Sequence, residues 1–421
     1  MIYGSIQGEK VSRLGFGAMR LPVLMGEDGK PTGTIDEAQV QKMVDYAIAN
    51  GVNYFDTAFP YHDGHSEEVL ARCLSKYPRD SYFLADKYPG HQIAKRYDPA
   101  DIFETQLKKC NAEYFDFYLL HNVYENSINV YLDPQWDIIN YFLKQKELGR
   151  IKHLGFSTHG QIETIERFLD AADGRMEFCQ IQINYLDWTL QDAKEKYEML
   201  TSRGIPVIAM ESVRGGMLAK LPEDLSAKLK ALALDETAGN AGGGQEAGNA
   251  KGGAPSDASW GYRWLQQLPN ISVILSGMSN FDQMVDNVNT FKEDKVITAE
   301  QDAVLMDIAE HLKGSVPCTA CRYCCDSCPM GLDIPVLIKK YNDYSVVPSF
   351  NVSMYIDSLP EDKKPSACVG CGNCMRMCPQ KIHIPEVLKK FSVELTKYPS
   401  WAEICRAREA AAEANRKAAK P

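Results

Sequence analysis

Eight short apolar segments alternate with longer helical patterns over about 290 residues, and this alternation limits the fold more than any other feature of the sequence. In the longer segments apolar residues recur three and four positions apart, as Val40, Met43, Val44 and Ala47 do, which is typical of an amphipathic helix. Strand–helix repetition builds a parallel sheet with crossover helices, and eight units favour a closed (β/α)8 TIM barrel over an open sheet. The predicted strands are residues 14–17, 54–56, 82–87, 115–121, 151–157, 178–183, 206–210 and 271–276, and the predicted helices are 36–50, 101–110, 136–148, 162–171, 190–203 and 280–291.

Two further observations concern the barrel. No Gly-x-Gly-x-x-Gly follows a strand and no Walker loop is present, which argues against a Rossmann fold. Residues 238–254 are rich in Gly, Ala and Asn without an apolar anchor, so we expect a flexible loop after the seventh strand. This loop is either a tolerated insertion or a mobile lid over a bound ligand.

Composition excludes several classes of protein. Hydrophobic residues make up 45% and charged residues 24%, which is typical of a globular chain and excludes wholesale disorder. The net charge of −10 without a basic run argues against a nucleic-acid partner. The N-terminus has no secretory signal and no stretch approaches 18 uninterrupted apolar residues, so we expect a soluble, cytoplasmic protein without a membrane partner.

Nine of the thirteen cysteines lie between Cys318 and Cys378. They form two copies of C-x2-C-x2-C-x3-C-P, separated by 50 residues, and an Ile-Pro followed by a helical pattern comes after each copy. In a reducing cytosol such clusters are typical of metal ligands rather than disulfides. The other four, Cys73, Cys110, Cys179 and Cys405, have no partner at ligand spacing and are predicted to be buried.

The spacing predicts two [4Fe–4S] clusters, each with three ligands from one copy of the motif and the fourth from the other. One set is Cys318, Cys321, Cys324 and Cys378, and the other is Cys368, Cys371, Cys374 and Cys328. A pair of zinc knuckles is the alternative, although zinc rarely uses this spacing twice. Cys325 is interpreted as a bystander beside Cys324. The repeat resembles bacterial dicluster ferredoxins, and its long spacing looks more like the α-helical ferredoxin domains fused to oxidoreductases.

Four polar residues stand at successive strand ends of the predicted barrel. Asp56-Thr-Ala-x-x-Tyr61 follows the second strand, Lys87 ends the third and His121 ends the fourth. They resemble the catalytic tetrad of the aldo-keto reductases, and the resemblance covers about residues 10–295.

Carbonyl reduction gives these four residue types a physical rationale. It requires a hydride at carbon and a proton at oxygen. A tyrosine is protonated at neutral pH, and a cation such as Lys87 makes it a better acid. Asp56 would fix Lys87, and His121 would orient the carbonyl oxygen.

The resemblance also implies a nicotinamide-binding set, namely Gly17, Met19, Arg20, Asp56, Ser157, Gln182, Met210, Gly215, Ser279, Gln283 and Asn287. Ser157 and Gln182 match the pair that holds the nicotinamide carboxamide. Met210 stands where the family often has an aromatic ring. The segment that starts at Gly277 resembles the adenosine-phosphate loop of potassium-channel β subunits and bacterial relatives, but Gly277 and Gln283 lack the charge that binds a 2′-phosphate. NADP(H) is the family expectation, and NAD(H) stays open.

These features predict a barrel over residues 1–298, a helical connector over 299–315, a small, mainly helical dicluster domain over 316–400 and a solvated tail over 401–421. We expect an oxidoreductase that reduces a small-molecule carbonyl, or oxidises the alcohol, with the clusters serving electron transfer or structure. The alternative is an electron-transfer or redox-sensing protein whose barrel binds nicotinamide with little turnover. Nicotinamide transfers two electrons at a time, whereas each cluster transfers one, and no flavin motif that could link the two is recognised. Whether the clusters exchange electrons with a redox partner protein stays open.

Overall fold

The computed structural model describes residues 1–90, 98–239, 255–313, 316, 318, 322, 324–346, 348, 350–378 and 380–418. The chain forms two compact units, one from most of residues 1–308 and the other mainly from residues 309–421.

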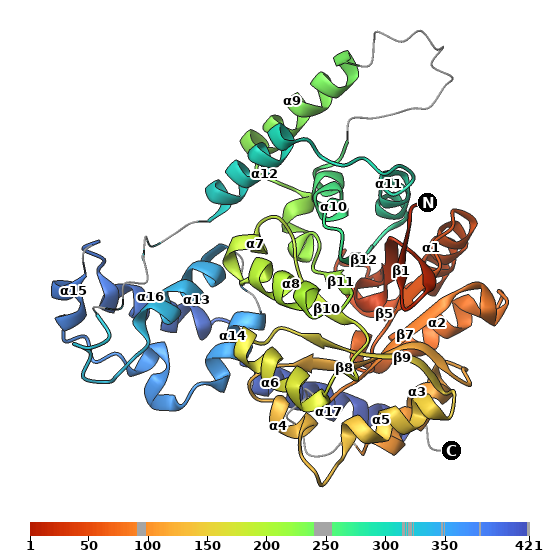
Figure 1. The fold of residues 1–421 in the computed structure, drawn as a ribbon, viewed down its shortest axis with the longest axis horizontal. Helices are drawn as coiled ribbons and strands as arrows, with labels where there is room; N and C mark the ends of the chain where they lie inside the picture. The colour runs from red at the N-terminus through yellow and green to blue at the C-terminus, as the bar shows by residue number, and fades with distance from the viewer. Residues whose placement is uncertain are drawn as a thin grey trace. The chain divides into compact units, whose positions relative to one another are not determined.

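Eight parallel strands close the barrel of the first unit in chain order (Figure 1). All eight were predicted, with ends displaced by two residues at most. They are β3 (Leu14–Gly17), β6 (Tyr54–Asp56), β7 (Phe83–Tyr88), β8 (Phe115–Val123), β9 (Ile151–Thr158), β10 (Cys179–Gln182), β11 (Val207–Met210) and β12 (Ile271–Ser276).

Helices follow the strands, as the apolar spacing predicted. They include α1 (Glu37–Ala49), α3 (Pro99–Lys109), α5 (Ile138–Glu147), α6 (Ile162–Ala172) and α11 (Phe281–Thr290). The helix predicted over 190–203 is divided into α7 (Asp187–Leu190) and α8 (Ala193–Ser202), because Asp192 adopts a left-handed conformation with φ of 52°. Two helices that were not predicted complete the ring, α2 (Ser66–Leu74) and α10 (Asp257–Gln266).

A hairpin closes the amino-terminal end of the barrel and was not predicted. It consists of β1 (Tyr3–Ile6) and β2 (Glu9–Ser12). Ile6 and Val11 are fully buried and pack with the interior residues Tyr54, Phe117 and Ile208. The barrel is therefore filled by side chains, and its carboxyl-terminal end carries the loops that can form a site.

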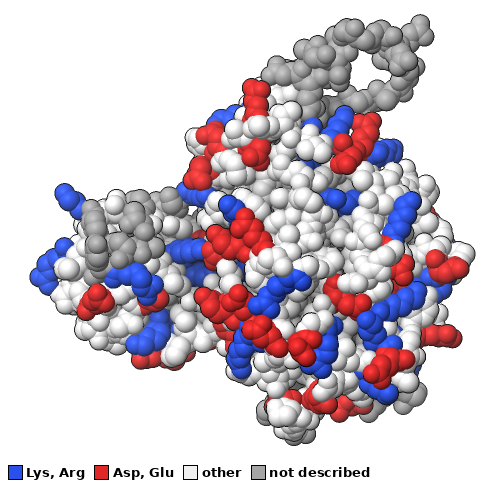
Figure 2. Space-filling model, in the orientation of Figure 1, with Lys and Arg blue, Asp and Glu red and all other residues white. Residues whose placement is uncertain are grey.

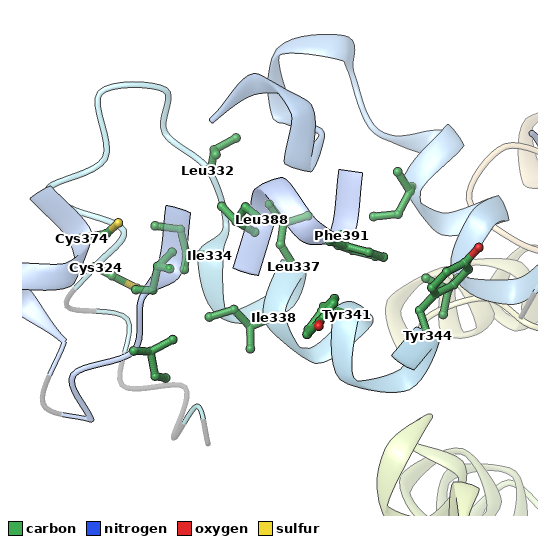
Figure 3. Packing of buried hydrophobic residues seen from close by; sticks show 14 residues of the cluster. Cys324, Leu332, Ile334, Leu337, Ile338, Tyr341, Tyr344, Cys374, Leu388 and Phe391 are labelled. Atoms are coloured by element: carbon green, nitrogen blue, oxygen red, sulfur yellow. The ribbon is translucent and has the colours of Figure 1, made fainter. Parts of the chain in front are cut away.

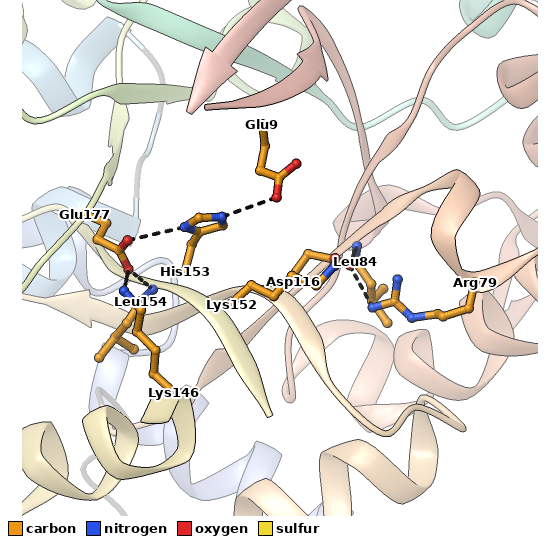
Figure 4. Close-up of polar contacts among 9 residues, drawn as sticks. All are labelled: Glu9, Arg79, Leu84, Asp116, Lys146, Lys152, His153, Leu154 and Glu177. Carbon is orange, nitrogen blue, oxygen red and sulfur yellow. Dashed lines mark hydrogen bonds and ion pairs between the residues drawn. The ribbon is translucent and has the colours of Figure 1, made fainter. Parts of the chain in front are cut away.

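Two carboxylates at the amino-terminal ends of the strands, one buried and one partly exposed, are compensated by basic neighbours (Figure 4). Asp116 in β8 pairs with Arg79 at 2.7 Å and with Lys152 at 2.8 Å. Glu177, before β10, pairs with Lys146 at 2.5 Å and with His153 at 3.3 Å. These contacts join neighbouring elements of the barrel on the side away from the strand ends that carry the predicted site.

The predicted connector begins as α12 (Ala299–Leu312), and the structure places its first ten residues in the barrel unit. Asp302 accepts a hydrogen bond of 2.9 Å from Nε1 of Trp264 in α10. Asp307 pairs with Lys228 of α9 (Glu223–Gly239), and α9 and α12 lie side by side (Figure 1). Residues 314 and 315 lie outside the described residues, as do residues 240–254 of the Gly-rich segment.

The described part of the second unit is helical. Its helices are α13 (Ile334–Val346), α14 (Phe350–Ser358), α15 (Asn373–Met377), α16 (Ile384–Leu395) and α17 (Trp401–Ala418). α13 and α16 begin at the two Ile-Pro pairs of the sequence repeat, as predicted. Leu337, Leu388 and Phe391 meet in its apolar core, with Cys324 and Cys374 at one end (Figure 3).

Residues 401–421 were expected to form a solvated tail, and this expectation is wrong for the first turns of α17. Trp401 and Cys405 are buried, and the main-chain N–H of Trp401 donates to Asp357 of α14 at 2.7 Å. An apolar face at the start of the helix packs on its neighbour, although the later sequence is rich in Ala and charged residues.

The surface carries both signs of charge. Figure 2 shows acidic and basic side chains interspersed over the visible face. None of the helices in the described part of the chain has the length and apolar composition needed to span a bilayer.

Candidate active site and cysteine-lined cavity

The four residues predicted as a tetrad lie on three adjacent strands of the barrel and in the turn that follows the first of them. Asp56 is the last residue of β6, Lys87 lies near the end of β7, and His121 lies in β8. Tyr61 begins the short helical turn η2 (Tyr61–Gly64) that follows β6. The register pairs Asp56 with Ala85 and Lys87 with Leu119, so the carboxyl-terminal ends of β6, β7 and β8 meet at one edge.

Lys87 is fully buried and has two oxygen partners at its ammonium. Nζ donates to Oδ1 of Asp56 at 2.6 Å and to the main-chain oxygen of Thr57 at 2.7 Å. Burial alone would lower the pKa of Lys87, but the negative charge of Asp56, together with Tyr61, raises it above its ordinary value. Lys87 therefore stays charged throughout the neutral range.

Tyr61 lies close to both Lys87 and His121. The centroid of its ring is 4.9 Å from Nζ of Lys87 and 6.0 Å from the imidazole centroid of His121, with the two rings nearly perpendicular at 83°. Burial raises the pKa of Tyr61, and the charge of Lys87 lowers it by less. Lys87 thus lowers the pKa of Tyr61, as expected. Burial has the larger effect, so the pKa as a whole is raised and the phenol is not more acidic than usual.

The turn that carries Tyr61 is anchored by neighbouring polar groups. His62 and Asp63 adopt left-handed conformations with φ of 49° and 53°. Nε2 of His62 accepts a hydrogen bond of 3.0 Å from the main-chain N–H of Leu21, which follows β3. Sequence reasoning did not identify this contact, since it depends on the local backbone.

The residues predicted to hold the nicotinamide carboxamide lie at the ends of β9 and β10. The Ser157 hydroxyl accepts a hydrogen bond of 2.8 Å from the N–H of Asn122. Nε2 of Gln182 donates to Asp187 at 2.6 Å. Asp187 is fully buried and also accepts from Asn184 at 2.7 Å, so it fixes the orientation of the Gln182 amide. Asp187 was not predicted, because no short motif marks a contact partner of this kind.

A second group of predicted residues lies where β3 and β12 end. Gly17 ends β3, and Met19 and Arg20 follow it with exposed side chains. Ser279 donates its hydroxyl to the main-chain oxygen of Arg20 at 3.0 Å, and its N–H donates to Gln283 at 2.8 Å.

Three further members of the predicted set differ in exposure. Asn287 is buried, and its amide donates to Ser276 at 2.9 Å, so it supports the loop from within. Met210 is half-buried at the end of β11, where its sulfur contacts Nε2 of Gln180 at 3.3 Å. Gly215 follows with a left-handed φ of 64°.

Glu211, next to Met210, was missed by the sequence analysis. A Cβ built on Gly215 would lie 3.8 Å from Oε2 of Glu211 and 3.3 Å from Nη2 of Arg20, so the two charged groups converge there. Burial raises the pKa of Glu211, and Arg20 opposes that shift. The segment AMESVRGG could have indicated Glu211, because it places charged residues directly after an apolar strand.

The cysteines of one predicted set line a single cavity in the second unit. Cys328, Cys368, Cys371 and Cys374 line this cavity, together with apolar residues that include Leu332, Val369 and Leu388. Burial and the neighbouring thiols of Cys368 and Cys371 raise the pKa of Cys374. Four thiols around an apolar hollow fit the soft donor set of a four-iron cluster.

The other predicted set is only partly described, since Cys321 lies outside the described residues. Cys324 is buried, and burial together with Cys325 raises its pKa to about 12. All described cysteines are free thiols, and Cys73, Cys110, Cys179 and Cys405 are buried as expected. Within the described ranges, no three His, Cys, Asp or Glu side chains are close enough together to hold one metal ion.

Comparison with known proteins identifies both units. Residues 13–310 match the model of the aldo/keto reductase family, and residues 317–384 match that of a 4Fe-4S dicluster domain. A probable aldo-keto reductase 1 from Glycine max is 27% identical over 239 residues, which are 53% of this chain and 63% of the relative. An NADPH-dependent alpha-keto amide reductase from Saccharomyces cerevisiae is 29% identical over 153 residues, which are 36% of this chain and 47% of the relative. The chain thus spans less than two thirds of either relative.

Solved structures agree on the fold. A thermostable aldo-keto reductase bound to the inhibitor epalrestat has a TM-score of 0.55 at 18% identity, with 73% of this chain and all of that chain covered. An aldo-keto reductase from Bacillus halodurans in its holo form has a TM-score of 0.54 at 22% identity, with 73% and 96% covered. At these identities the likeness establishes the fold alone. Because the family model covers more than half of the chain, the chain belongs to the aldo/keto reductase family, with a 4Fe-4S dicluster domain after its barrel.

Proposed function

We propose that the barrel reduces a small-molecule aldehyde or ketone, or oxidises the corresponding alcohol, with NADP(H). The observation that carries this proposal is the fully buried Lys87–Asp56 pair, with its ammonium 4.9 Å from the ring centroid of Tyr61 and the imidazole centroid of His121 6.0 Å from the same ring. A bound nicotinamide would supply the hydride. The chain's own residues supply the proton and hold the carbonyl oxygen.

Each of the four residues has a distinct role in this reaction. Burial raises the pKa of Tyr61, so its hydroxyl holds a proton at neutral pH and donates it to the carbonyl oxygen. Lys87 stabilises the phenolate that is left, and Asp56 keeps Lys87 charged and in place. His121, whose imidazole lies next to the ring of Tyr61, orients the carbonyl oxygen.

The cofactor is assigned to the loops at the carboxyl-terminal ends of the strands. Ser157 and Gln182 hold the carboxamide, and Met210 packs against the ring. Ser279, Gln283 and the start of α11 hold the adenosine phosphate. Two cations lie near this group: Arg20, whose main-chain oxygen accepts the Ser279 hydroxyl, and Lys42, whose ammonium lies 3.9 Å from the ring centroid of Phe281 at the start of α11. Comparing KM for NADPH and NADH decides between the two cofactors, because only NADPH carries the 2′-phosphate.

We also propose that the second unit carries two [4Fe–4S] clusters with the two ligand sets given above. The cavity lined by Cys328, Cys368, Cys371 and Cys374 supports one of them. It brings together thiols from both copies of the motif, as the exchange of the fourth ligand requires.

Tyr61→Phe tests the proposed reaction. The change keeps the ring but removes the proton donor, so we expect kcat for reduction of 4-nitrobenzaldehyde by NADPH to fall about 10²- to 10⁴-fold. Binding of NADPH, followed by fluorescence titration, should stay within about twofold. Wild-type turnover by Tyr61→Phe would refute the proposed role. Tyr77→Phe, at a half-buried pair with Asp45 away from the site, is the matched control.

A further inference from the structure

A buried polar cluster lies between the barrel wall and the helices behind the proposed catalytic residues. At its centre is Gln106 of α3, which is fully buried. Its Nε2 donates to Oε1 of Glu67 in α2 at 3.0 Å and to the main-chain oxygen of Lys87 at 3.1 Å. Its Oε1 accepts the hydroxyl of Tyr118 in β8. One side-chain amide therefore joins α2, β7 and β8.

Each of these elements carries, or directly follows, one proposed catalytic residue. The bond to β7 is made to Lys87 itself. Tyr118 precedes His121 by three residues in the same strand, and Glu67 follows Tyr61 by six. These separations along the chain are short, so fixing the three bonded groups restricts the relative positions of Lys87, Tyr61 and His121.

Lys109 extends the cluster to the turn that carries Tyr61. Its ammonium binds the carboxylate of Glu67 and the main-chain oxygen of Gly64, the last residue of η2. The side chain of Glu67 is fully buried, so Lys109 supplies the compensating charge that a buried carboxylate requires.

Asp86 holds the other side of the Lys87 backbone. Its Oδ1 accepts the N–H of Lys87 at 2.8 Å, and its Oδ2 lies 3.7 Å from Sγ of Cys110. Burial, and then the negative charge of Glu67, raise the pKa of Asp86 well above its usual range, which favours the neutral acid. The cluster thus binds the main chain of Lys87 through both its N–H and its carbonyl oxygen.

We propose that Gln106 is a positioning residue for this reaction, since it holds Lys87, the turn of Tyr61 and the strand of His121 in register. The proposal rests on the function proposed above for these residues. Gln106 lies outside the barrel and acts through its hydrogen bonds rather than by contact with substrate or cofactor.

Gln106→Met tests the proposal, because methionine has a similar volume but makes none of the three hydrogen bonds. We expect kcat for 4-nitrobenzaldehyde to fall about 10- to 100-fold, as small misplacements of catalytic groups do, while KM for NADPH changes little. The pH profile of kcat should also move. Gln145→Met is the matched control, since Gln145 is a buried glutamine on α5 that contacts Arg150 at 3.0 Å before β9 begins. It should leave kcat and its pH profile unchanged.

A second variant covers the case in which Gln106→Met does not fold. Tyr118→Phe keeps the packing and removes only the hydroxyl that Gln106 accepts. We expect it to lower kcat in the same direction by about two- to fivefold. Wild-type kcat and pH profile in Tyr118→Phe, and in Gln106→Met where it folds, would overturn the proposal.

A spectroscopic measurement separates this proposal from the proposed function. In protein labelled with ¹³Cζ-tyrosine, the NMR signal missing from Tyr61→Phe belongs to Tyr61. Gln106→Met or Tyr118→Phe should shift that signal, and Gln145→Met should not. If the protein reduces no carbonyl compound, the proposed function fails, but the shift still decides whether Gln106 positions Tyr61. An unmoved signal refutes the positioning role.

Discussion

Lys87 and Asp56 are removed from water together, and this shared burial makes each depend on the other. Nζ and Oδ1 are 2.6 Å apart, and both side chains have almost no exposed surface. A buried charge without its partner is strongly destabilising, whereas replacing both members of such a pair by apolar residues is often nearly neutral. Stability and catalysis therefore respond differently to changes at this pair.

Lys87→Met should lower the free energy of unfolding by about 3–5 kcal/mol, because Asp56 is left buried without its cation. The double variant Asp56→Leu/Lys87→Met should recover most of that loss, while both variants lack carbonyl reduction. Urea denaturation followed by far-UV circular dichroism measures the first effect and NADPH oxidation the second. Equal destabilisation in the single and double variants would show that the pair is not energetically coupled.

At the residue scale the sequence predicted the groups with a strong local motif. Asp56, Lys87 and His121 were predicted because each stands at the end of an apolar run, and Tyr61 because it completes the motif that resembles the aldo-keto reductases. The structure brings the four together. Their supporting contacts could not be predicted. The contact between Gln182 and Asp187 and the Gln106 cluster depend on side-chain orientation and on helices that approach the barrel from distant parts of the chain.

At the scale of elements, buried apolar runs identified all eight barrel strands. The hairpin of β1 and β2 was missed because its strands have four residues each and partly exposed faces. The break between α7 and α8 was missed because it depends on a left-handed Asp192. Short or partly exposed elements are fixed by tertiary contacts more than by local pattern.

Glu177 links neighbouring elements of the barrel, and its contribution to stability depends on pH. Partial burial alone would raise its pKa, but hydrogen bonds from His153, Lys146 and the N–H of Leu154 lower it to about 2 (Figure 4). In the unfolded chain the pKa is the ordinary value of about 4.3. The stabilisation is therefore complete above about pH 5 and is lost as the pH falls towards 2.

Glu177→Gln should lower the free energy of unfolding at pH 7 by about 2 kcal/mol, allowing for screening of a partly exposed group. The difference from wild type should shrink as the pH falls from 5 to 3. Urea denaturation at a series of pH values measures it. Glu147→Gln, in an exposed pair with Lys144, is the control and should change stability by less than about 0.5 kcal/mol at any pH. A difference in the free energy of unfolding that does not change with pH would contradict the stabilising role of the Glu177 charge.

At the scale of the whole molecule, the chain combines an aldo/keto reductase barrel with a 4Fe-4S dicluster domain. The sequence repeat predicted the second unit well, because α13 and α16 follow the two cysteine motifs at equivalent positions. The spacing also predicted that Cys328 joins the cysteines of the other motif, and the structure places these four residues around one cavity. The predicted boundary between the barrel and the connector was also approximate, because α12 packs on the barrel.

Removal of one cavity thiol tests the two-cluster assignment in the full chain. Anaerobically purified wild type should contain about eight iron and eight sulfide per chain, from two four-iron clusters. Cys371→Ser removes a thiol that lines the cavity and should reduce the iron content to about four, with a matching loss of absorbance near 400 nm. Cys325→Ser is the matched control, because Cys325 belongs to neither ligand set, and it should retain all the iron. Zinc in place of iron would refute the iron–sulfur assignment. Equal iron loss in both variants would refute the ligand sets, because Cys371 lines the cavity and Cys325 does not.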